Sequence, residues 1–218
     1  MSDCTTWPTS CLTVTIAERT WTLERIADLE TLWDLMDDDD DDDHIPYWVE
    51  VWPASLALAA WFESHPESLQ GQRCLDLGCG LGLTALVAAS LGARVTALDH
   101  TWSAVHFARK NTILNHVTPS PLWVQMDWCR PAFQPSMFDS IWGGDILYEQ
   151  RFFDPLLALF RHALAPCGRI ILCSPDRTVT RPVWGRLIQE GWQVKELQPA
   201  NHLLQDHKAA VRLMQLTR

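Results

Sequence analysis

The stretch Arg73-Cys-Leu-Asp-Leu-Gly-Cys-Gly-Leu-Gly82 carries the strongest structural signal in the chain. Its first part, Arg73 to Leu77, is short, mostly apolar and ends at a glycine, which predicts a buried strand. Thr84 to Leu91 follows as an apolar helix. The three glycines between them let the backbone turn tightly and approach a ligand without a Cβ in the way. We call residues 76–82 the glycine loop and expect it to bind a ligand.

The carboxylate of Asp76, at the start of the glycine loop, indicates the charge of that ligand. Beside a pyrophosphate this carboxylate would be repelled, and the loop does not match the dinucleotide fingerprint G-x-G-x-x-G. A carboxylate is better placed for a ligand that bears an ammonium group, and S-adenosylmethionine carries both an amino group and a cationic sulfonium. We therefore expect that cofactor to lie against Asp76 and the loop residues Gly78, Cys79, Gly80 and Gly82.

Strands and helices alternate outward from the glycine loop. The expected strands are Arg73–Leu77, Arg94–Leu98, Leu122–Met126, Ser140–Gly143, Arg169–Cys173, Trp192–Leu197 and Ala210–Leu216. The expected helices are Ser55–Ser64, Thr84–Leu91, Thr101–Asn115, Phe153–Leu164 and Pro182–Glu190. Alternation predicts a parallel sheet covered on both faces. The fold class is therefore α/β, a doubly wound, mostly parallel, seven-stranded Rossmann-like sheet that ends in an antiparallel hairpin.

Two further features of the chain complete this organisation. Pro166-Cys-Gly168 is expected to turn the chain into the fifth strand. Residues 1–45 look unlike the rest, and we expect them to form an N-terminal cover, a hairpin with an acidic loop, on a main domain of residues 46–218. In the cover, Leu12–Ile16 and Thr20–Ile26 alternate like the strands of a hairpin, and Glu30–Met36 has the length of one helical turn.

The seven acids Asp37 to Asp43 form an acidic run that must be a solvated loop, because adjacent carboxylates repel one another. The run lacks the spaced ligands, the glycine and the final glutamate of a calcium-binding EF-hand. Two interpretations stay open. The run is a solvated spacer, or it attracts a substrate that carries lysine.

Two later strands also end in acids. Asp99 ends the second strand, where a carboxylate can accept hydrogen bonds from both hydroxyls of a ribose. Asp127 and Trp128 follow the third strand, and we expect Asp127 to accept from an adenine amino group while Trp128 contacts the ring. His100 is expected to touch the cofactor or to be a plain loop residue. Each acid also has a simpler interpretation as a helix cap or turn former.

Gly143-Gly-Asp-Ile-Leu-Tyr148 follows the fourth strand. Because ligands bind beyond the carboxyl ends of the strands in open α/β sheets, we expect Asp145 and Tyr148 to face the reacting group. The spacing brings both to one side if the chain turns helically there. Asp145 could accept hydrogen bonds from an incoming amine, and Tyr148 could orient it. The alternative is that Asp145 caps a helix and Tyr148 is a core aromatic.

These motifs together resemble the seven-stranded S-adenosylmethionine-dependent methyltransferases, over about residues 46–218. Within them the chain is similar to methyltransferase family 16, on Pro46-Tyr-Trp48 with Trp52-Pro53, the glycine loop and Asp145-Ile-Leu-Tyr148. The resemblance implies that Trp52 lies over the cofactor and that Asp145 and Tyr148 border the acceptor pocket. Members often carry Asp-Pro-Gly-Arg after the fifth strand, where this chain has Ser174-Pro-Asp-Arg177.

The resemblance implies an N-methyltransferase that acts on a lysine side chain of a protein. Two alternatives stay open: a small-molecule N-methyltransferase with the same cofactor site, and a cofactor-binding module without catalysis. An open, acidic cleft would favour a protein acceptor, and a closed apolar pocket would favour a small amine.

The amino-acid composition excludes several classes of partner and ligand. The chain has 218 residues and a formal net charge of −10, with only three lysines, so we expect no nucleic-acid partner. Seven cysteines, an odd number without a C-x-x-C pair, and no signal-peptide pattern indicate reduced thiols and a cytoplasmic location. No apolar stretch approaches the roughly 18 residues of a membrane span. Histidines and cysteines lack zinc spacing, so no metal is expected.

Overall fold

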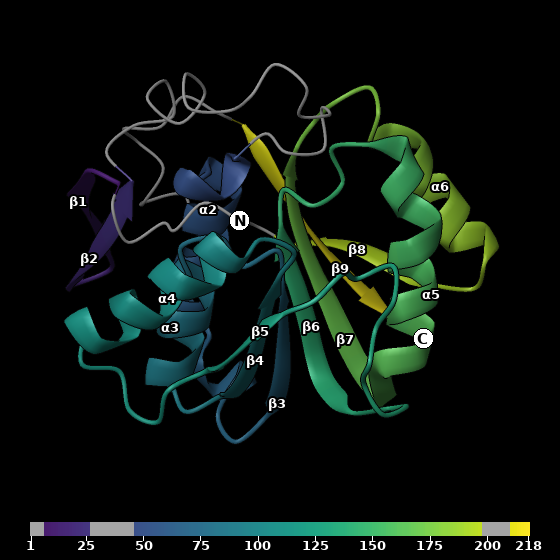
Figure 1. The fold of residues 1–218 in the computed structure, drawn as a ribbon. Coiled ribbons are helices and arrows are strands. Elements are labelled where there is room, and N and C mark those ends of the chain that lie inside the picture. The colour runs from purple at the N-terminus through teal and green to yellow at the C-terminus, as the bar shows by residue number, and fades with distance from the viewer. Residues whose placement is uncertain (1–6, 27–45, 198–209) are drawn as a thin grey trace, which may run out of the picture.

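The computed structural model describes residues 7–26, 46–197 and 210–218 (Figure 1). Two expectations, the helical turn at Glu30–Met36 and the acidic run Asp37–Asp43, lie outside the described residues. Within the three described ranges, no helix has both the length and the apolar character that a membrane crossing requires.

Seven strands form one sheet in the order β5-β4-β3-β6-β7-β9-β8. Neighbours from β5 to β7 run parallel, and β9 pairs antiparallel with both β7 and β8. The strands are β3 (Arg73–Leu77), β4 (Arg94–Asp99), β5 (Leu122–Gln125), β6 (Phe138–Gly144), β7 (Leu164–Pro175), β8 (Gln193–Leu197) and β9 (Val211–Thr217). This topology confirms the predicted α/β sheet and its antiparallel C-terminal pair.

Helices cover both faces of the sheet. In Figure 1, α2, α3 and α4 lie on one face, and α5 and α6 lie on the other. Their bounds are α2 (Pro53–Ser64), α3 (Leu83–Ser90), α4 (Trp102–Leu114), α5 (Phe153–Ala163) and α6 (Arg181–Gln189). Three short 3-10 helices, η3 (Tyr47–Val49), η4 (Pro66–Ser68) and η5 (Gln150–Phe152), join these elements. The sheet is therefore doubly wound, as predicted.

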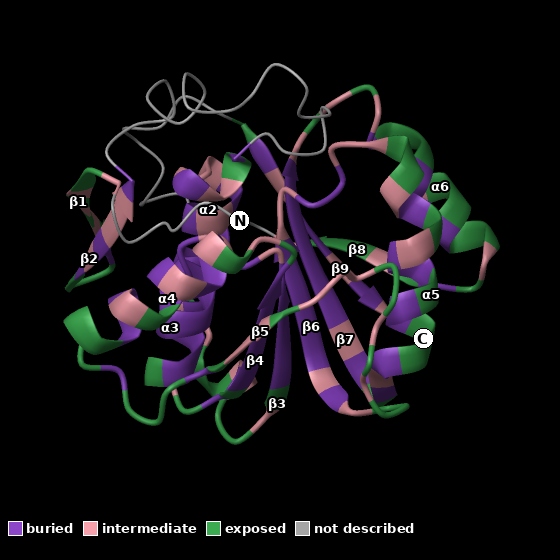
Figure 2. Cartoon of the chain, in the orientation of Figure 1, coloured by how far each residue is buried: buried purple, intermediate pink, exposed green. Residues whose placement is uncertain are grey.

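The central strands are buried on both faces, and the edge strands are not (Figure 2). Every residue of β3 and β4 after the first is buried, because helices cover each side. The edge strands β5 and β8 keep exposed positions. One hydrophobic cluster joins α2 and α3 to the sheet, and a second joins α5 and α6 to it. These two clusters hold the carboxyl ends of the parallel strands together at one edge.

Strand β7 begins earlier than the sequence predicted. It starts at Leu164, directly after α5, and the expected turn at residues 166–168 lies inside it. The pairing with β6 shifts there, because Phe138 faces Leu164 while Ser140 faces Arg169. Cys167 takes a left-handed φ of 62° in this irregular segment. The turn is present as a bulge, and pairing on both sides of it extends the strand.

A separate hairpin, β1 (Thr9–Ile16) and β2 (Arg19–Ile26), packs against α4 and α2. The free edge of β2 pairs with two asparagine side chains of α4. Asn111 accepts from the Glu24 N–H at 2.7 Å and donates to its carbonyl at 3.2 Å, and Asn115 does the same with Thr22 at 2.9 and 2.7 Å. The side chains thus satisfy backbone groups of β2. The division into a cover and a main domain stays a prediction.

Candidate active site

The glycine loop lies between β3 and α3, where the sequence predicted it. Gly78, Gly80 and Gly82 have φ angles of +65°, +50° and +91°, in the left-handed region that favours glycine. The backbone N–H of Cys79 donates to the Leu98 carbonyl at 2.9 Å, which ties the loop to β4. The predicted tight turn is therefore present, and the N-terminus of α3 follows it.

Asp76, the last residue but one of β3, is 1% exposed. The Thr84 hydroxyl in the first turn of α3 donates to its carboxylate at 2.5 Å. Burial raises the pKa of Asp76 to about 7, and the charge of Asp99 adds to the increase, although Thr84 and the Ala85 N–H stabilise the ionised form. In the described chain, no cation is among the groups that act on this pKa.

Asp99, the last residue of β4, is 8% exposed and organises the same loop. Its carboxylate accepts from the Gly80 N–H at 2.9 Å and from the Thr101 N–H at 3.0 Å. Burial raises the pKa of Asp99, and these two N–H groups oppose the increase. Two buried carboxylates thus lie at neighbouring strand ends. A positively charged ligand would stabilise their ionised forms, so this donor set fits a cofactor that carries an ammonium or sulfonium group.

After β5, Asp127 and Trp128 contact different parts of the protein. The Asp127 carboxylate accepts from the Cys129 N–H at 2.8 Å, as in the turn-forming interpretation. Trp128 lies beside the glycine loop, because a Cβ at Gly78 would be 3.4 Å from its ring. His100 is exposed, and its carbonyl accepts from the Gln125 side chain. Their predicted contacts with a cofactor stay predictions.

An aromatic row joins the glycine loop to the segment before α2. Its members, in order, are Trp128, Phe152, Tyr148, Tyr47 and Trp52, and their consecutive ring centroids are 5.3, 5.3, 5.9 and 6.0 Å apart. The Trp52 indole N–H also donates to the Tyr47 carbonyl at 2.8 Å. Tyr47 is 42% exposed, so the row reaches the surface.

The sequence did not single out Tyr47 or Phe152 as members of this row. Tyr47 stands in the Pro-Tyr-Trp stretch that carries the family resemblance, which is a usable signal. Phe152 precedes a helix in the chain and has no local pattern that distinguishes it from a core residue. Its position is decided by Tyr148 and Trp128, which come from different loops.

Asp145 and Tyr148 lie in the loop after β6, and this loop is not helical. Asp145 has a left-handed φ of 58°, and its N–H donates to the Cys173 carbonyl at 2.7 Å. Its carboxylate forms a bidentate ion pair with Arg177. Tyr148 instead packs in the aromatic row, and burial together with the charge of Glu149 raises its pKa to about 12. The two residues thus have different partners, and their common role at an acceptor stays a prediction.

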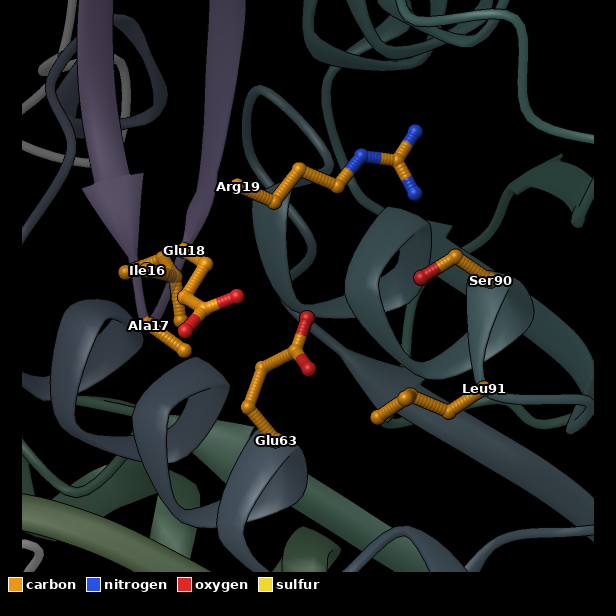
Figure 3. Close-up of a pocket in the computed structure, with 7 residues that line it drawn as sticks. All are labelled: Ile16, Ala17, Glu18, Arg19, Glu63, Ser90 and Leu91. Atoms are coloured by element: carbon orange, nitrogen blue, oxygen red, sulfur yellow. The ribbon is translucent and has the colours of Figure 1, made fainter.

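A shallow hollow elsewhere on the molecule contains none of the predicted residues. It lies between the turn of the hairpin and the C-terminal ends of α2 and α3 (Figure 3). Glu63 extends into it, and burial raises the pKa of this side chain while Arg19 lowers it. Among the described residues, the polar lining of the hollow is Glu18, Arg19, Glu63 and Ser90, and it contains no glycine loop and no acid at a strand end. The strand-end residues are therefore the better candidate site.

The two sequence comparisons with known proteins agree on one family. A sequence profile described as lysine methyltransferase matches residues 40–190. The chain is 33% identical over 132 residues to protein N-lysine methyltransferase METTL21A of Mus musculus, which covers 58% of this chain and 60% of that protein. It is 34% identical over 112 residues to the electron transfer flavoprotein beta subunit lysine methyltransferase of Danio rerio, which covers 51% of this chain and 42% of that protein. The chain therefore aligns with less than two thirds of the length of each relative.

A solved structure has the same fold. The 16S rRNA N2 G1207 methyltransferase (RsmC) of T. thermophilus, in complex with AdoMet and guanosine, superposes with a TM-score of 0.67. The match covers 97% of this chain and 51% of that chain, at 19% sequence identity. At this identity the likeness establishes the fold alone.

Proposed function

This chain belongs to the lysine methyltransferase family, and from that premise we propose that it is an S-adenosylmethionine-dependent N-methyltransferase that acts on a lysine side chain of a protein. The curated relatives are named for the same activity. We propose the cytosol as its compartment, which is supported by unpaired cysteines such as Cys11 and Cys129 on the described surface. A nucleic-acid acceptor is disfavoured by the net charge of −10.

The cofactor residues follow from the chemistry of the strand ends. S-adenosylmethionine supplies an electrophilic methyl group on a sulfonium. Asp76 and the glycine loop would hold its methionine end, and Asp99 would accept hydrogen bonds from the ribose. Asp127, Trp128 and His100 would lie at the adenine side, and Trp52 would cover the site. The raised pKa of Asp76 supports this assignment, because a bound ammonium group would compensate the buried charge.

The acceptor residues would act mainly by alignment. Methyl transfer is an in-line displacement, in which the amine nitrogen forms the new N–C bond while the C–S bond breaks. Holding the nitrogen in line and excluding water therefore supply most of the catalysis. Asp145 would accept a hydrogen bond from the amine and direct its lone pair. Tyr148 would hold the apolar stem of the lysine with its ring face, as part of the aromatic row.

The observation that carries the proposal is the course of the aromatic row. At one end, the ring of Trp128 lies 3.4 Å from a Cβ built at Gly78 in the glycine loop. Toward the other end, the row passes from Tyr148 to Tyr47, which is 42% exposed. The row is apolar, but Tyr47 opens it to the surface, whereas the pocket of a small amine would be closed. An open wall of this kind suits a long side chain that enters from another protein.

The first experiment uses tritium-labelled S-adenosylmethionine with an extract of the cells that make this protein. The wild-type chain is compared with Asp145→Ala. The matched control is Asp139→Ala, because Asp139 forms a similar bidentate pair with Arg73 at the opposite, amino end of β3. We expect label in one protein band with the wild type and the control, and loss of that label with Asp145→Ala.

Other outcomes discriminate between the candidate functions. Label confined to small molecules would favour a small-amine acceptor, and label in RNA would contradict the proposed protein substrate. No label with any chain, together with no binding of S-adenosylmethionine by calorimetry, would reject the enzyme and its cofactor. Binding without transfer to any fraction would favour a module that has lost catalysis.

A further inference from the structure

The Asp145 carboxylate already has a cationic partner. Arg177, in the loop between β7 and α6, contacts both carboxylate oxygens with its guanidinium, and Nη2 donates to Oδ2 at 2.8 Å. The side chain of Asp145 is 9% exposed and that of Arg177 is 37% exposed. The carboxylate of the pair is therefore largely buried, and the guanidinium is partly exposed to solvent.

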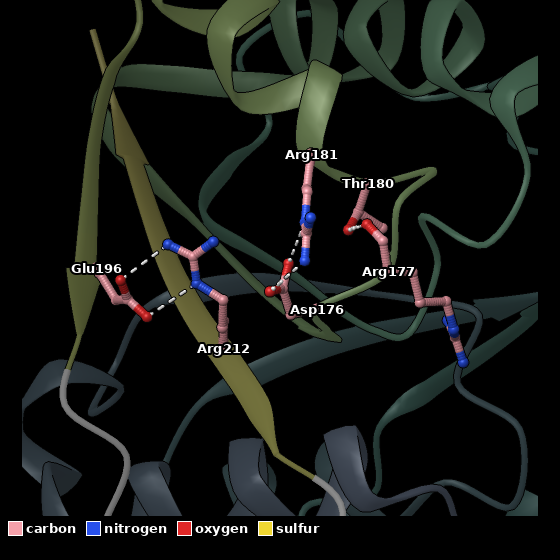
Figure 4. Close-up of polar contacts among 6 residues, drawn as sticks. All are labelled: Asp176, Arg177, Thr180, Arg181, Glu196 and Arg212. Atoms are coloured by element: carbon pink, nitrogen blue, oxygen red, sulfur yellow. Dashed lines mark hydrogen bonds and ion pairs between the residues drawn. The ribbon is translucent and has the colours of Figure 1, made fainter.

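The Arg177 backbone is held firmly in this loop. Its N–H donates to the Pro175 carbonyl at 2.9 Å, and its own carbonyl accepts from the Thr180 hydroxyl at 2.9 Å. Figure 4 shows that the Arg177 side chain extends away from the neighbouring pair of Arg181 and Asp176. Arg177 and Arg181 therefore pair with different carboxylates, Asp145 and Asp176.

A lone carboxylate creates a problem for methyl transfer to an amine. Only the neutral amine has a lone pair for the attack, and a lysine ammonium ordinarily has a pKa of about 10.4. An uncompensated carboxylate nearby stabilises the ammonium form further, which opposes the reaction. A carboxylate that is paired with a guanidinium has little net charge. It still keeps two of its roughly four lone-pair positions for another hydrogen bond.

We propose that Arg177 is a positioning residue that compensates the charge of Asp145, so that this carboxylate accepts a hydrogen bond from a neutral acceptor amine instead of holding an ammonium ion. The inference rests on the proposed function and assigns a role to one more residue in it. The lysine releases its proton to solvent before the attack. The nitrogen then forms the N–C bond, the sulfonium leaves as a thioether, and the positive charge moves to the methylated nitrogen.

The other titratable groups that the structure describes around Asp145 supply no positive charge that could compensate its carboxylate in place of Arg177. The buried Cys173 thiol on β7 lies near it, and burial and the charge of Asp145 both raise the pKa of that thiol, so it stays neutral. The loop after β6 adds Tyr148, whose hydroxyl stays protonated, and Glu149, which pairs with Arg151. Within the described chain, Arg177 is the cation that contacts the Asp145 carboxylate.

The test measures kcat against pH with the full chain, saturating S-adenosylmethionine and the purified protein that takes up label in the extract experiment. The rise of kcat with pH reports deprotonation in the bound complex. We expect Arg177→Gln to move the midpoint of this rise upward by about one pH unit or more. At neutral pH its kcat should fall by about tenfold or more and recover at high pH.

Three controls separate compensation from a structural role. Arg181→Gln removes the same charge from the same region and should leave the midpoint unchanged. Arg177→Lys keeps the charge and should restore the midpoint at least in part. The double variant Asp145→Asn with Arg177→Gln removes both charges, so its midpoint should return toward that of the wild type, even though its rate is lower.

The experiment distinguishes failure of the inference on Arg177 from failure of the proposed function. If the wild type transfers no methyl group to any protein, the proposed function fails and the inference with it. If the wild type is active and Arg177→Gln lowers kcat equally at every pH, the inference is overturned and Arg177 is only structural. A faster Arg177→Gln enzyme at neutral pH would also overturn it, because that result means that Arg177 blocks the acceptor site.

Discussion

The Thr84 hydroxyl donates a 2.5 Å hydrogen bond to the carboxylate of Asp76, and this bond joins the end of β3 to the first turn of α3. The two residues enclose the glycine loop between them. The bond stabilises a carboxylate that is only 1% exposed, yet the pKa of Asp76 still lies at about 7. The ionised form of Asp76 is therefore costly in the protein without its cofactor, which leads to the first two predictions.

Stability without cofactor should fall as pH rises through the range from about 4 to 7. The pKa of Asp76 is raised on folding, so the native state binds more protons than the unfolded state in this window. Between pH 5.5 and 8 the loss should be on the order of 1–2 kcal/mol. Asp76→Asn should remove this part of the slope. Urea unfolding of the wild type and of Asp76→Asn at pH 5.5 and pH 8 gives the change in unfolding free energy with pH. The same change in both proteins would contradict the raised pKa of Asp76.

Affinity for S-adenosylmethionine should increase as pH rises from 5.5 to 7. The cofactor's cationic groups favour ionised Asp76, and binding must displace the proton that this carboxylate holds at low pH. The dissociation constant should fall roughly tenfold over this range. Asp76→Asn should bind weakly with little pH dependence. Calorimetry at each pH gives the constants, and a wild-type affinity that does not depend on pH would exclude a direct contact with Asp76.

Tyr148 should act through its ring. Because burial raises the pKa of its hydroxyl to about 12, the group stays protonated at ordinary assay pH and cannot serve as a base. Tyr148→Phe keeps the ring contacts with Tyr47 and Phe152, so kcat should fall by less than about tenfold. Tyr148→Ala should cost about 100-fold, because it opens the aromatic row and misaligns the acceptor. Similar losses in both variants would assign the role to the hydroxyl instead.

Gly82→Ala should destabilise the protein more than the same substitution at a glycine that has a similar left-handed backbone but no close neighbour. A Cβ at Gly82 would lie 2.7 Å from the Trp123 ring, at a φ of +91°. Gly191 is the matched control, because it has a φ of +88° and no atom within 4 Å of a built Cβ. Both variants should lose about 1–2 kcal/mol from the left-handed backbone.

The additional loss at Gly82 should be about 1–3 kcal/mol from overpacking against Trp123. Urea unfolding of the two variants and the wild type gives the difference directly. Equal losses would mean that the indole moves aside without cost. In that case the close approach of the glycine loop to β5 would not be a packing constraint.

Local pattern was enough to predict the order of strands and helices, the glycine loop and the acids at strand ends. Arg73–Leu77 is recognisable as a strand because a central parallel strand is buried on both faces and needs mostly apolar residues, which Cys74, Leu75 and Leu77 supply around the functional acid Asp76. Gly78 and Gly82 indicate the loop because their left-handed backbone is costly for any other residue. These properties belong to a few consecutive residues, so the sequence by itself determines them.

The partners of the functional side chains were decided only by tertiary structure. Asp145 pairs with Arg177, which is 32 residues away, and Tyr148 contacts Tyr47 from a segment before α2. The early start of β7 likewise depends on pairing with β6 around the bulge. Such contacts arise when packing of two hydrophobic clusters brings separate loops to one edge of the sheet. Periodicity within a segment carries no information about which distant loop will face it.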